Sequence, residues 1–234
     1  MKPIIGIVSR FFSVDNKNEM MIRDDYRRTI IDCGGIPMVI LPTQSISYVD
    51  TKYRDQNELS DEEKEMLNKE LSVCDGFLFP GGGKINNFDI YIRDYAIEHD
   101  IPILGICLGM QIISNYGRDI YNKKIVSDIN HNVDNKEGIH FVNINTDSML
   151  YRIVGSNQIY VNSYHNFMAV NNDKLKVVAK SLDGVIEAVE MPGKKFVLGV
   201  QWHPEKNYDI DEYSKIIIES FISASLNNTL NNKK

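Results

Sequence analysis

Three features that would define whole classes of protein are scarce or missing in this sequence. It has only three cysteines in 234 residues. That number is odd and their spacing is not that of a metal site, which argues against a disulfide framework and suits a reducing compartment. No stretch reaches the roughly 18 apolar residues of a membrane span, and the N-terminal apolar run is too short for a signal peptide. We therefore expect a cytoplasmic protein with no membrane partner.

Positive charge is scarce as well. The chain has 26 lysines and arginines against 32 acidic residues, a net charge of −6. The basic residues are scattered, so the electrostatic footprint of a nucleic-acid-binding protein is missing, and small polar substrates or proteins are the expected partners. With 43% hydrophobic residues, the chain can bury a full core. We expect one domain over residues 1–226 and a polar tail over 227–234, and the sequence leaves a homodimer open.

The first half of the chain alternates apolar runs of strand length with segments of helical periodicity. This alternation predicts an α/β fold with an open, mostly parallel sheet flanked by helices, in which ligands bind beyond the carboxyl ends of the strands. After Gly117, short alternating segments predict additional antiparallel strands. The expected strands are 3–9, 36–42, 75–80, 102–106, 138–144, 158–161, 175–179, 185–189 and 196–201; the expected helices are 20–33, 60–74, 88–99 and 211–226; and 43–57 is expected to be a loop.

A candidate nucleophile lies where the strand at 102–106 passes into helical spacing. Gly105 and Gly109 flank Cys107, the pattern of a nucleophile elbow, in which a crowded turn leaves room only for hydrogen beside the nucleophile. At a helix N-terminus the thiolate is favoured over the thiol. A buried cysteine acting as a small hydrophobe is the alternative.

Two further segments could complete such a site. The triplet Gly81, Gly82 and Gly83 follows a predicted strand and allows N–H groups to point into a cavity, as an oxyanion site requires, although a simple tight turn has the same composition. Of the five histidines, His203 is the strongest candidate base, because it directly follows a buried strand and Glu205 can turn back toward its ring after Pro204. A core or capping histidine remains the alternative.

Several of these segments together resemble the class I glutamine amidotransferase superfamily. Gly105 to Gln111 reads GICLGMQ and Gly199 to Glu205 reads GVQWHPE. Within that superfamily the chain is most similar to the C26 peptidase-type γ-glutamyl hydrolases, including γ-glutamyl-γ-aminobutyrate hydrolase-like enzymes. The segments that carry this narrower similarity are PIIGI from residue 3, GGIP from residue 34 leading to Leu41-Pro42, VNSYH from residue 161 and DGVIEA from residue 183.

The resemblance implies a flavodoxin-like fold and assigns roles to residues. It implies a catalytic triad of Cys107, His203 and Glu205, and an oxyanion hole formed by the N–H groups of Gly82 and Leu108. It further implies that a γ-glutamyl group is held by Gly81, Gly83, Gln111, Ser163, Tyr164 and His165.

Two departures from the relatives concern the substrate rather than the triad. The relatives usually carry arginine where this chain has Leu108. They also have a longer insertion before the helix that here begins near Phe88, with Phe-Glu in place of Phe88-Asp89. We therefore expect the γ-glutamyl half of the substrate to be shared and the amine half to differ.

The sequence predicts a hydrolase that cleaves a γ-glutamyl amide through a thioester on Cys107, with no metal ligand and no cofactor. Two alternatives stay open. One is a glutaminase subunit that delivers ammonia to a separate synthase chain. The other is a non-enzymatic binding module on the same scaffold.

Overall fold

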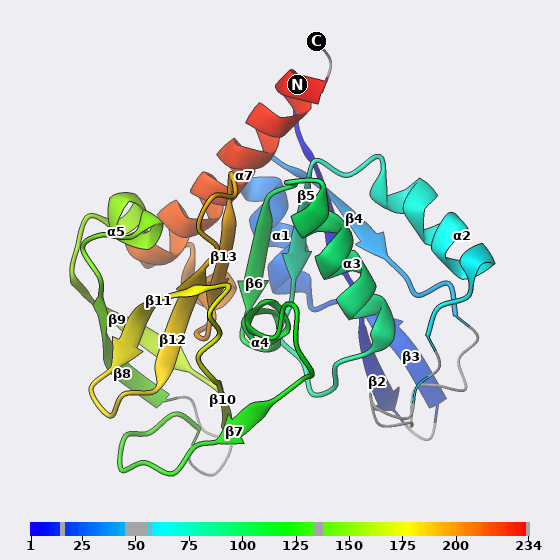
Figure 1. The fold of residues 1–234 in the computed structure, drawn as a ribbon. Helices are drawn as coiled ribbons and strands as arrows, with labels where there is room; N and C mark the ends of the chain where they lie inside the picture. Colours follow the sequence, from blue (N-terminus) through cyan, green and yellow to red (C-terminus); the bar gives the residue numbers. More distant parts are fainter. Residues whose placement is uncertain (15–16, 45–55, 57, 133–137, 233–234) are drawn as a thin grey trace.

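The computed structural model describes residues 1–14, 17–44, 56, 58–132 and 138–232. Its centre is a nine-stranded sheet in the order β4-β1-β5-β6-β13-β12-β11-β8-β9 (Figure 1). The first five strands are parallel, and from β13 onward every neighbouring pair is antiparallel. The strands are β1 (Ile4–Val8), β4 (Ile36–Ile40), β5 (Gly76–Phe79), β6 (Ile103–Ile106), β8 (Gly138–Ile144), β9 (Gln158–Ser163), β11 (Lys176–Ser181), β12 (Ile186–Glu190) and β13 (Val197–Val200).

Helices cover both faces of the parallel half, because its strands are apolar on both sides. Phe77 and Phe79 point to the face packed by α2 (Asp61–Leu71), α3 (Asn87–Glu98) and α4 (Leu108–Ser114). Leu78, between them, points to the face packed by α1 (Asp24–Asp32), α5 (Met149–Val154) and α7 (Glu212–Asn232). The predicted α/β class, with its mostly parallel sheet and later antiparallel strands, is confirmed.

The start of α2 follows directly from its sequence. Ser60 caps the helix by accepting a hydrogen bond from the Glu63 N–H, and the Glu63 carboxylate accepts one from the Ser60 N–H. This is the capping box that the sequence pattern predicts.

The N-terminal third differs from the prediction in one respect. The helix expected from residue 20 begins only at Asp24, and residues 20 and 21 belong to a hairpin of β2 (Arg10–Val14) and β3 (Lys17–Met21). Met20 and Met21 match helical spacing, but pairing with β2 satisfies their backbone instead. The predicted loop 43–57 lies mostly outside the described residues.

Three smaller elements and the C-terminus also differ. α5, α6 (Pro204–Asn207) and the two-stranded ribbon of β7 (Asn122–Lys124) and β10 (Phe167–Ala169) were not predicted, since each is too short to establish a period. Helix α7 continues past residue 227, where the sequence indicates a polar tail. Asn228 and Thr229 are buried and donate side-chain hydrogen bonds to the carbonyls of Asp75 and Ser225, which offsets the polarity of this last stretch.

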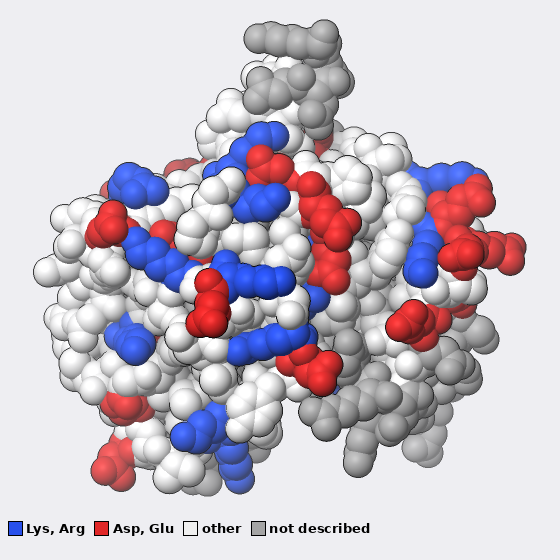
Figure 2. Space-filling view, viewed as in Figure 1, with Lys and Arg blue, Asp and Glu red and all other residues white. Residues whose placement is uncertain are grey.

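On the face shown in Figure 2, basic and acidic side chains are interspersed among the described residues. None of the helices described is both long enough and apolar enough to cross a membrane.

Candidate active site

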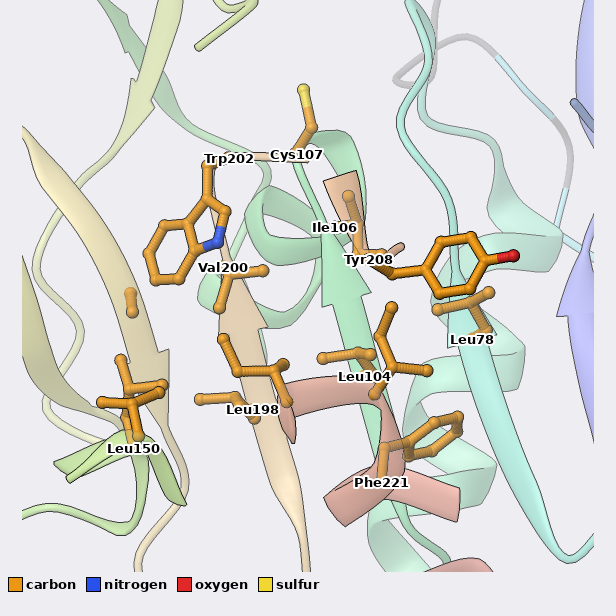
Figure 3. Close-up of a cluster of buried hydrophobic side chains, with 14 of the residues drawn as sticks. Leu78, Leu104, Ile106, Cys107, Leu150, Leu198, Val200, Trp202, Tyr208 and Phe221 are labelled. Atoms are coloured by element: carbon orange, nitrogen blue, oxygen red, sulfur yellow. The ribbon is translucent and has the colours of Figure 1, made fainter. Parts of the chain in front are cut away.

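Three neighbouring parallel strands bring the predicted catalytic segments together. In the register of the sheet, Gly105 of β6 lies between Phe79 of β5 and Gly199 of β13. The carboxyl ends of these strands therefore meet at one edge, where β5 is followed by the glycine triplet, β6 by Cys107 and β13 by the segment that carries His203. Figure 3 shows the Cys107 sulfur at this edge, directed away from the apolar cluster beneath it.

The backbone at Cys107 has the sharp turn expected of a nucleophile elbow. Its φ of 54° and ψ of −105° are unusual for a residue with a side chain, a conformation of the kind that stores about 1–3 kcal/mol. A Cβ on Gly105 would lie 2.6 Å from the Gly109 carbonyl carbon, and a Cβ on Gly109 would lie 2.0 Å from the Phe79 oxygen. The prediction that only hydrogen fits on either side of Cys107 is confirmed.

His203 and Glu205 meet through the short helix α6. Pro204 occupies its first turn, and the His203 Nδ1 lies 2.6 Å from the Glu205 carboxylate oxygen Oε1. Both side chains are buried. Since a carboxylate accepts, Nδ1 carries the proton and Nε2 is left to exchange a proton with another group.

The charge state of His203 follows from its neighbours. Burial alone would lower the pKa of the imidazole, but the Glu205 carboxylate and the Cys107 sulfur outweigh it and raise this pKa to about 10. The ring is therefore protonated at neutral pH and places a positive charge beside the Cys107 sulfur.

The glycine triplet lies against the same sulfur. A Cβ on Gly81 would lie 3.0 Å from the His203 ring and 3.4 Å from the Cys107 Cβ. The Gly81 N–H donates to the Tyr26 hydroxyl oxygen over 2.9 Å. Burial, aided by the nearby Glu205 carboxylate, holds the pKa of Tyr26 well above its usual value, so the phenol is neutral.

An arginine fixes the position of this triplet. Both Nε and Nη2 of Arg10 donate to the Pro80 carbonyl, at 3.1 and 3.0 Å. The Arg10 Nη1 forms a buried ion pair with Asp89 Oδ1 at 2.5 Å. The other Asp89 oxygen accepts from the Asn86 N–H and caps α3. In the sequence, Asp89 stands out only because relatives carry glutamate at this position. In the structure it connects the start of α3 to the glycine triplet.

These groups enclose a cavity of about 390 Å³. Cys107 and His203 both line it, and the side chains of Arg23 and Lys206 bring positive charge to it. The Lys206 ammonium also lies 3.6 Å from the centroid of the Tyr164 ring. The cavity is lined by Phe12, Arg23, Tyr26, Gly81, Gly82, Gly83, Cys107, Tyr164, His203 and Lys206.

The structure separates the predicted substrate-binding residues into two groups. Gly81, Gly83 and Tyr164 line the cavity. Gln111 does not: its amide donates to the Phe167 carbonyl and to the Gln201 side chain. The remaining two, Ser163 and His165, are buried beside His131, where the His165 Nε2 lies 3.3 Å from the His131 Nδ1.

The side chain of Leu108 also lies outside the cavity, where a role in substrate specificity would have placed it. Its side chain is buried in the apolar core, and its Cδ2 lies 3.2 Å from where a Gly82 Cβ would be. Its backbone opens α4 immediately after Cys107. The side chain therefore packs against the glycine triplet and does not line the cavity.

Four lining residues were missed by sequence reasoning. Lys206 follows Glu205 directly and could have been found by extending that motif by one residue. Phe12, Arg23 and Tyr26 belong to the hairpin and to the start of α1, and only the tertiary fold brings them to the site.

Comparison with protein families gives a match over this region. The family model for Peptidase C26 matches residues 84–205, which include Cys107, His203 and Glu205. Glutamine amidotransferase-like protein RP404 of Rickettsia prowazekii (strain Madrid E) is 29% identical, over 87% of this chain and 91% of its own length. Gamma-glutamyl-gamma-aminobutyrate hydrolase PuuD of Escherichia coli (strain K12) is 26% identical, over 95% of this chain and 93% of its own length.

Solved structures share the fold at lower identity. The glutaminase domain of Trypanosoma brucei CTPS with bound acivicin superposes with a TM-score of 0.66 at 19% identity, covering 96% of this chain and 94% of that one. A glutamine amidotransferase from Thermotoga maritima gives a TM-score of 0.57 at 15% identity, with 97% of each chain covered. The flavodoxin-like arrangement of the class I glutamine amidotransferases is therefore the fold of this chain.

Proposed function

This chain belongs to the Peptidase C26 family of glutamine amidotransferase-like hydrolases, and from that membership we propose that it cleaves the γ-glutamyl amide bond of a small γ-glutamyl amine. One observation carries the proposal. Cys107, the His203–Glu205 pair and the glycine triplet converge from three adjacent strands on one cavity. We further propose that residues 1–226 act as a single hydrolase domain.

The reaction proceeds in two steps. The Cys107 thiolate attacks the γ-carbonyl carbon, and the N–H groups of Gly82 and Leu108 stabilise the oxyanion. The C–N bond breaks as the His203 imidazolium gives its proton to the departing amine. Water then attacks the thioester while His203 takes its proton, which releases glutamate and regenerates the thiolate. Glu205 holds the ring and compensates its positive charge.

The cavity suits such a substrate in size and charge. Its volume of about 390 Å³ lies within the range of small-molecule sites. A γ-glutamyl amine carries a free α-carboxylate, and Arg23 and Lys206 are the cationic side chains at this cavity. We assign substrate contact to these two and to Gly81, Gly83 and Tyr164. Gln111, Ser163 and His165 act from behind the cavity wall, by holding its backbone.

A panel of γ-glutamyl amides tests the proposal. We expect wild type to release glutamate from at least one of them and to form a transient adduct of one γ-glutamyl group on Cys107, seen by mass spectrometry of the quenched protein. Cys107→Ser should lower kcat/KM at least about a thousandfold, because the hydroxyl lacks the thiolate's nucleophilicity.

Cys33→Ser is the matched control. Burial raises the pKa of the Cys33 thiol to about 11, and Cys33 lies at the far end of α1, so its loss should leave the activity intact. Substantial turnover by Cys107→Ser would exclude Cys107 as the nucleophile. Absence of both adduct and glutamate across the panel would favour the binding-module alternative.

The name of the Rickettsia relative favours a second candidate, a glutaminase subunit that supplies ammonia to a synthase chain. Glutamine belongs in the panel for this reason. A marked preference for glutamine over γ-glutamyl amines, rising when a synthase chain is added, would select this alternative.

A further inference from the structure

A second cluster of reactive side chains lies behind the cavity wall and has no part in the proposed reaction. His131, His140, His165 and Glu187 are all buried, and Glu187 is 0% exposed. They come from the loop after β7, from β8, from the loop before β10 and from β12. The β7–β10 ribbon lies beside the ends of these antiparallel strands in Figure 1. Since the four residues are spread from position 131 to 187, their sequence gives no ligand spacing.

Four of the six separations among the inward-facing atoms are close to those of a tetrahedral metal site. One nitrogen from each histidine and one Glu187 oxygen all lie within 4.8 Å of one another. The Glu187 Oε1 is 3.4 Å from His131 Nδ1, 3.5 Å from His140 Nε2 and 3.6 Å from His165 Nε2. His131 Nδ1 is 3.3 Å from His165 Nε2. Zinc bonds of about 2.0–2.1 Å in tetrahedral geometry place neighbouring ligand atoms about 3.3–3.4 Å apart.

The outward nitrogen of each ring is already engaged by an acceptor. His131 Nε2 lies 2.9 Å from Asp183 Oδ2, His165 Nδ1 lies 3.2 Å from the Phe167 carbonyl, and His140 Nδ1 lies 3.3 Å from the Phe141 carbonyl. Each of these nitrogens must therefore carry the ring proton, which leaves the lone pair of every neutral ring directed inward. Carboxylates and carbonyls in this position are the usual outer partners of metal-bound histidines.

The outer partner of His131 is itself held in place. The hydroxyls of Ser127 and Ser181 both donate hydrogen bonds to the Asp183 carboxylate.

Three lone pairs and a carboxylate that converge in a buried space repel one another unless a cation lies between them. Within the part of the chain that the structure describes, neither oxygen of Glu187 accepts a hydrogen bond, and the inward His140 Nε2 has no hydrogen-bond partner. We propose that His131, His140, His165 and Glu187 form a binding site for a divalent transition metal, with zinc as the best match.

The donor set decides the metal class and the role. Three imidazoles and one carboxylate suit zinc better than magnesium or calcium, which prefer oxygen ligands alone. Because the protein supplies all four ligands, no position stays open for water or substrate, so the metal is structural. The hydrolysis proposed for Cys107 does not require it, and this inference stands independently of that function.

The metal would fix one wall of the cavity. His165 follows Tyr164, whose ring meets the His203 ring edge-on at 6.0 Å. On the same segment, Asn162 exchanges two hydrogen bonds with the His203 backbone, at 2.9 and 3.0 Å. A metal bound to His165 therefore holds the loop that carries Tyr164 beside the catalytic histidine.

Metal content and thermal stability test the site directly in the full chain. Protein produced with added zinc and then exchanged into metal-free buffer should retain about one zinc per chain by plasma mass spectrometry. Removal of the metal with a strong chelator should lower Tm, and Zn²⁺ alone should restore it in a concentration-dependent way. Co²⁺ in its place should give the intense visible absorption bands of a tetrahedral site.

Two variants and a control locate the site. Glu187→Gln should weaken Zn²⁺ binding at least about a hundredfold, and Asp183→Asn, which changes the outer partner of His131 and leaves all four ligands in place, by about 10- to 100-fold. His99→Gln should bind Zn²⁺ as wild type does, because His99 is exposed at the end of α3, far from the cluster in the fold.

The wild-type measurements decide the matter even if Glu187→Gln fails to fold. The proposal would be overturned if wild-type protein took up no stoichiometric Zn²⁺ and its Tm responded to neither chelator nor Zn²⁺. Protons shared between the four side chains would then supply the positive charge at the cluster. Equal loss of zinc in His99→Gln would overturn it as well, since the bound metal would then lie elsewhere.

Discussion

Cys107 and His203 each occupy a state that would be unfavourable in isolation. Cys107 holds a strained backbone angle, and His203 is a buried imidazolium. Glu205 makes the second state stable, because its carboxylate lies 2.6 Å from the ring. A buried ion that loses a counter-ion is strongly destabilised, so the charge of His203 depends on this contact as well as on the Cys107 sulfur.

Glu205→Gln should therefore change both the pH dependence and the stability. Loss of the carboxylate lowers the pKa of His203, so the alkaline limb of kcat/KM should move to lower pH. The pKa of His203 is about 10 in the folded protein and about 6.5 in the unfolded chain, so protonation of this ring stabilises the fold. This contribution to the free energy of unfolding is fully present below about pH 6.5 and is lost as the pH rises toward 10. The stability gap between wild type and variant, measured by urea denaturation, should thus be widest below about pH 6.5.

Glu190→Gln is the matched control for this experiment. Glu190 is also a buried carboxylate on a neighbouring strand, but its partner is the Met149 N–H at the start of α5. We expect its pH profile of kcat/KM to match that of wild type. An unmoved alkaline limb in Glu205→Gln would contradict the role given to Glu205.

At the scale of elements, the junction of β6 and α4 is the most tightly constrained part of the fold. α4 approaches β5 so closely that Gly109 touches the Phe79 backbone, and Gly105 lies under the first turn of the same helix. A side chain at either position would separate the helix from the sheet. The position of Cys107 therefore depends on two residues whose only contribution is the lack of a Cβ.

Gly109→Ala should be severely destabilising. The new Cβ would lie 2.0 Å from the Phe79 carbonyl oxygen, and the backbone on both sides would have to move, at a cost of about 3 kcal/mol. Equilibrium denaturation followed by circular dichroism measures this. Gly155→Ala is the control: Gly155 has φ of 70° but no neighbour within 4 Å, so only backbone strain of about 1 kcal/mol is expected. Similar losses in the two variants would contradict the close approach of α4 to β5.

At the scale of the whole molecule, one buried ion pair joins segments 79 positions apart in the sequence. Arg10 begins the β2–β3 hairpin, and Asp89 lies in the first turn of α3. Between them lies the Pro80 carbonyl, which Arg10 also binds. The pair thereby connects the hairpin, the glycine loop and the helix that follows it.

Asp89→Asn should destabilise the protein by about 3–5 kcal/mol, because it leaves the Arg10 guanidinium buried without a counter-charge. Activity should fall with it, since Arg10 also fixes the glycine loop. Asp24→Asn breaks the solvent-exposed ion pair with Arg27 and should leave the denaturation midpoint unchanged. Equal behaviour of the two variants would contradict a structural role for the Arg10–Asp89 pair.

The sequence by itself determined the alternation of strands and helices that builds the main sheet, the glycine-flanked turn at Cys107 and the pairing of His203 with Glu205. These are local properties: apolar periodicity, the space that a turn leaves for a side chain, and a proline that redirects two residues. Resemblance to a family extended them to an oxyanion hole and a substrate.

Only the tertiary structure decided which distant residues share a space. Phe12, Arg23 and Tyr26 reach the cavity because the hairpin and α1 lie over the ends of the strands, and Leu108 leaves it because α4 turns its side chain into the core. Likewise, Gln111, Ser163 and His165 point away from the cavity, and two of them meet His131, from a loop more than 30 residues earlier. Strand order and loop path set these contacts, and neither has a period or a spacing that can be read along the chain.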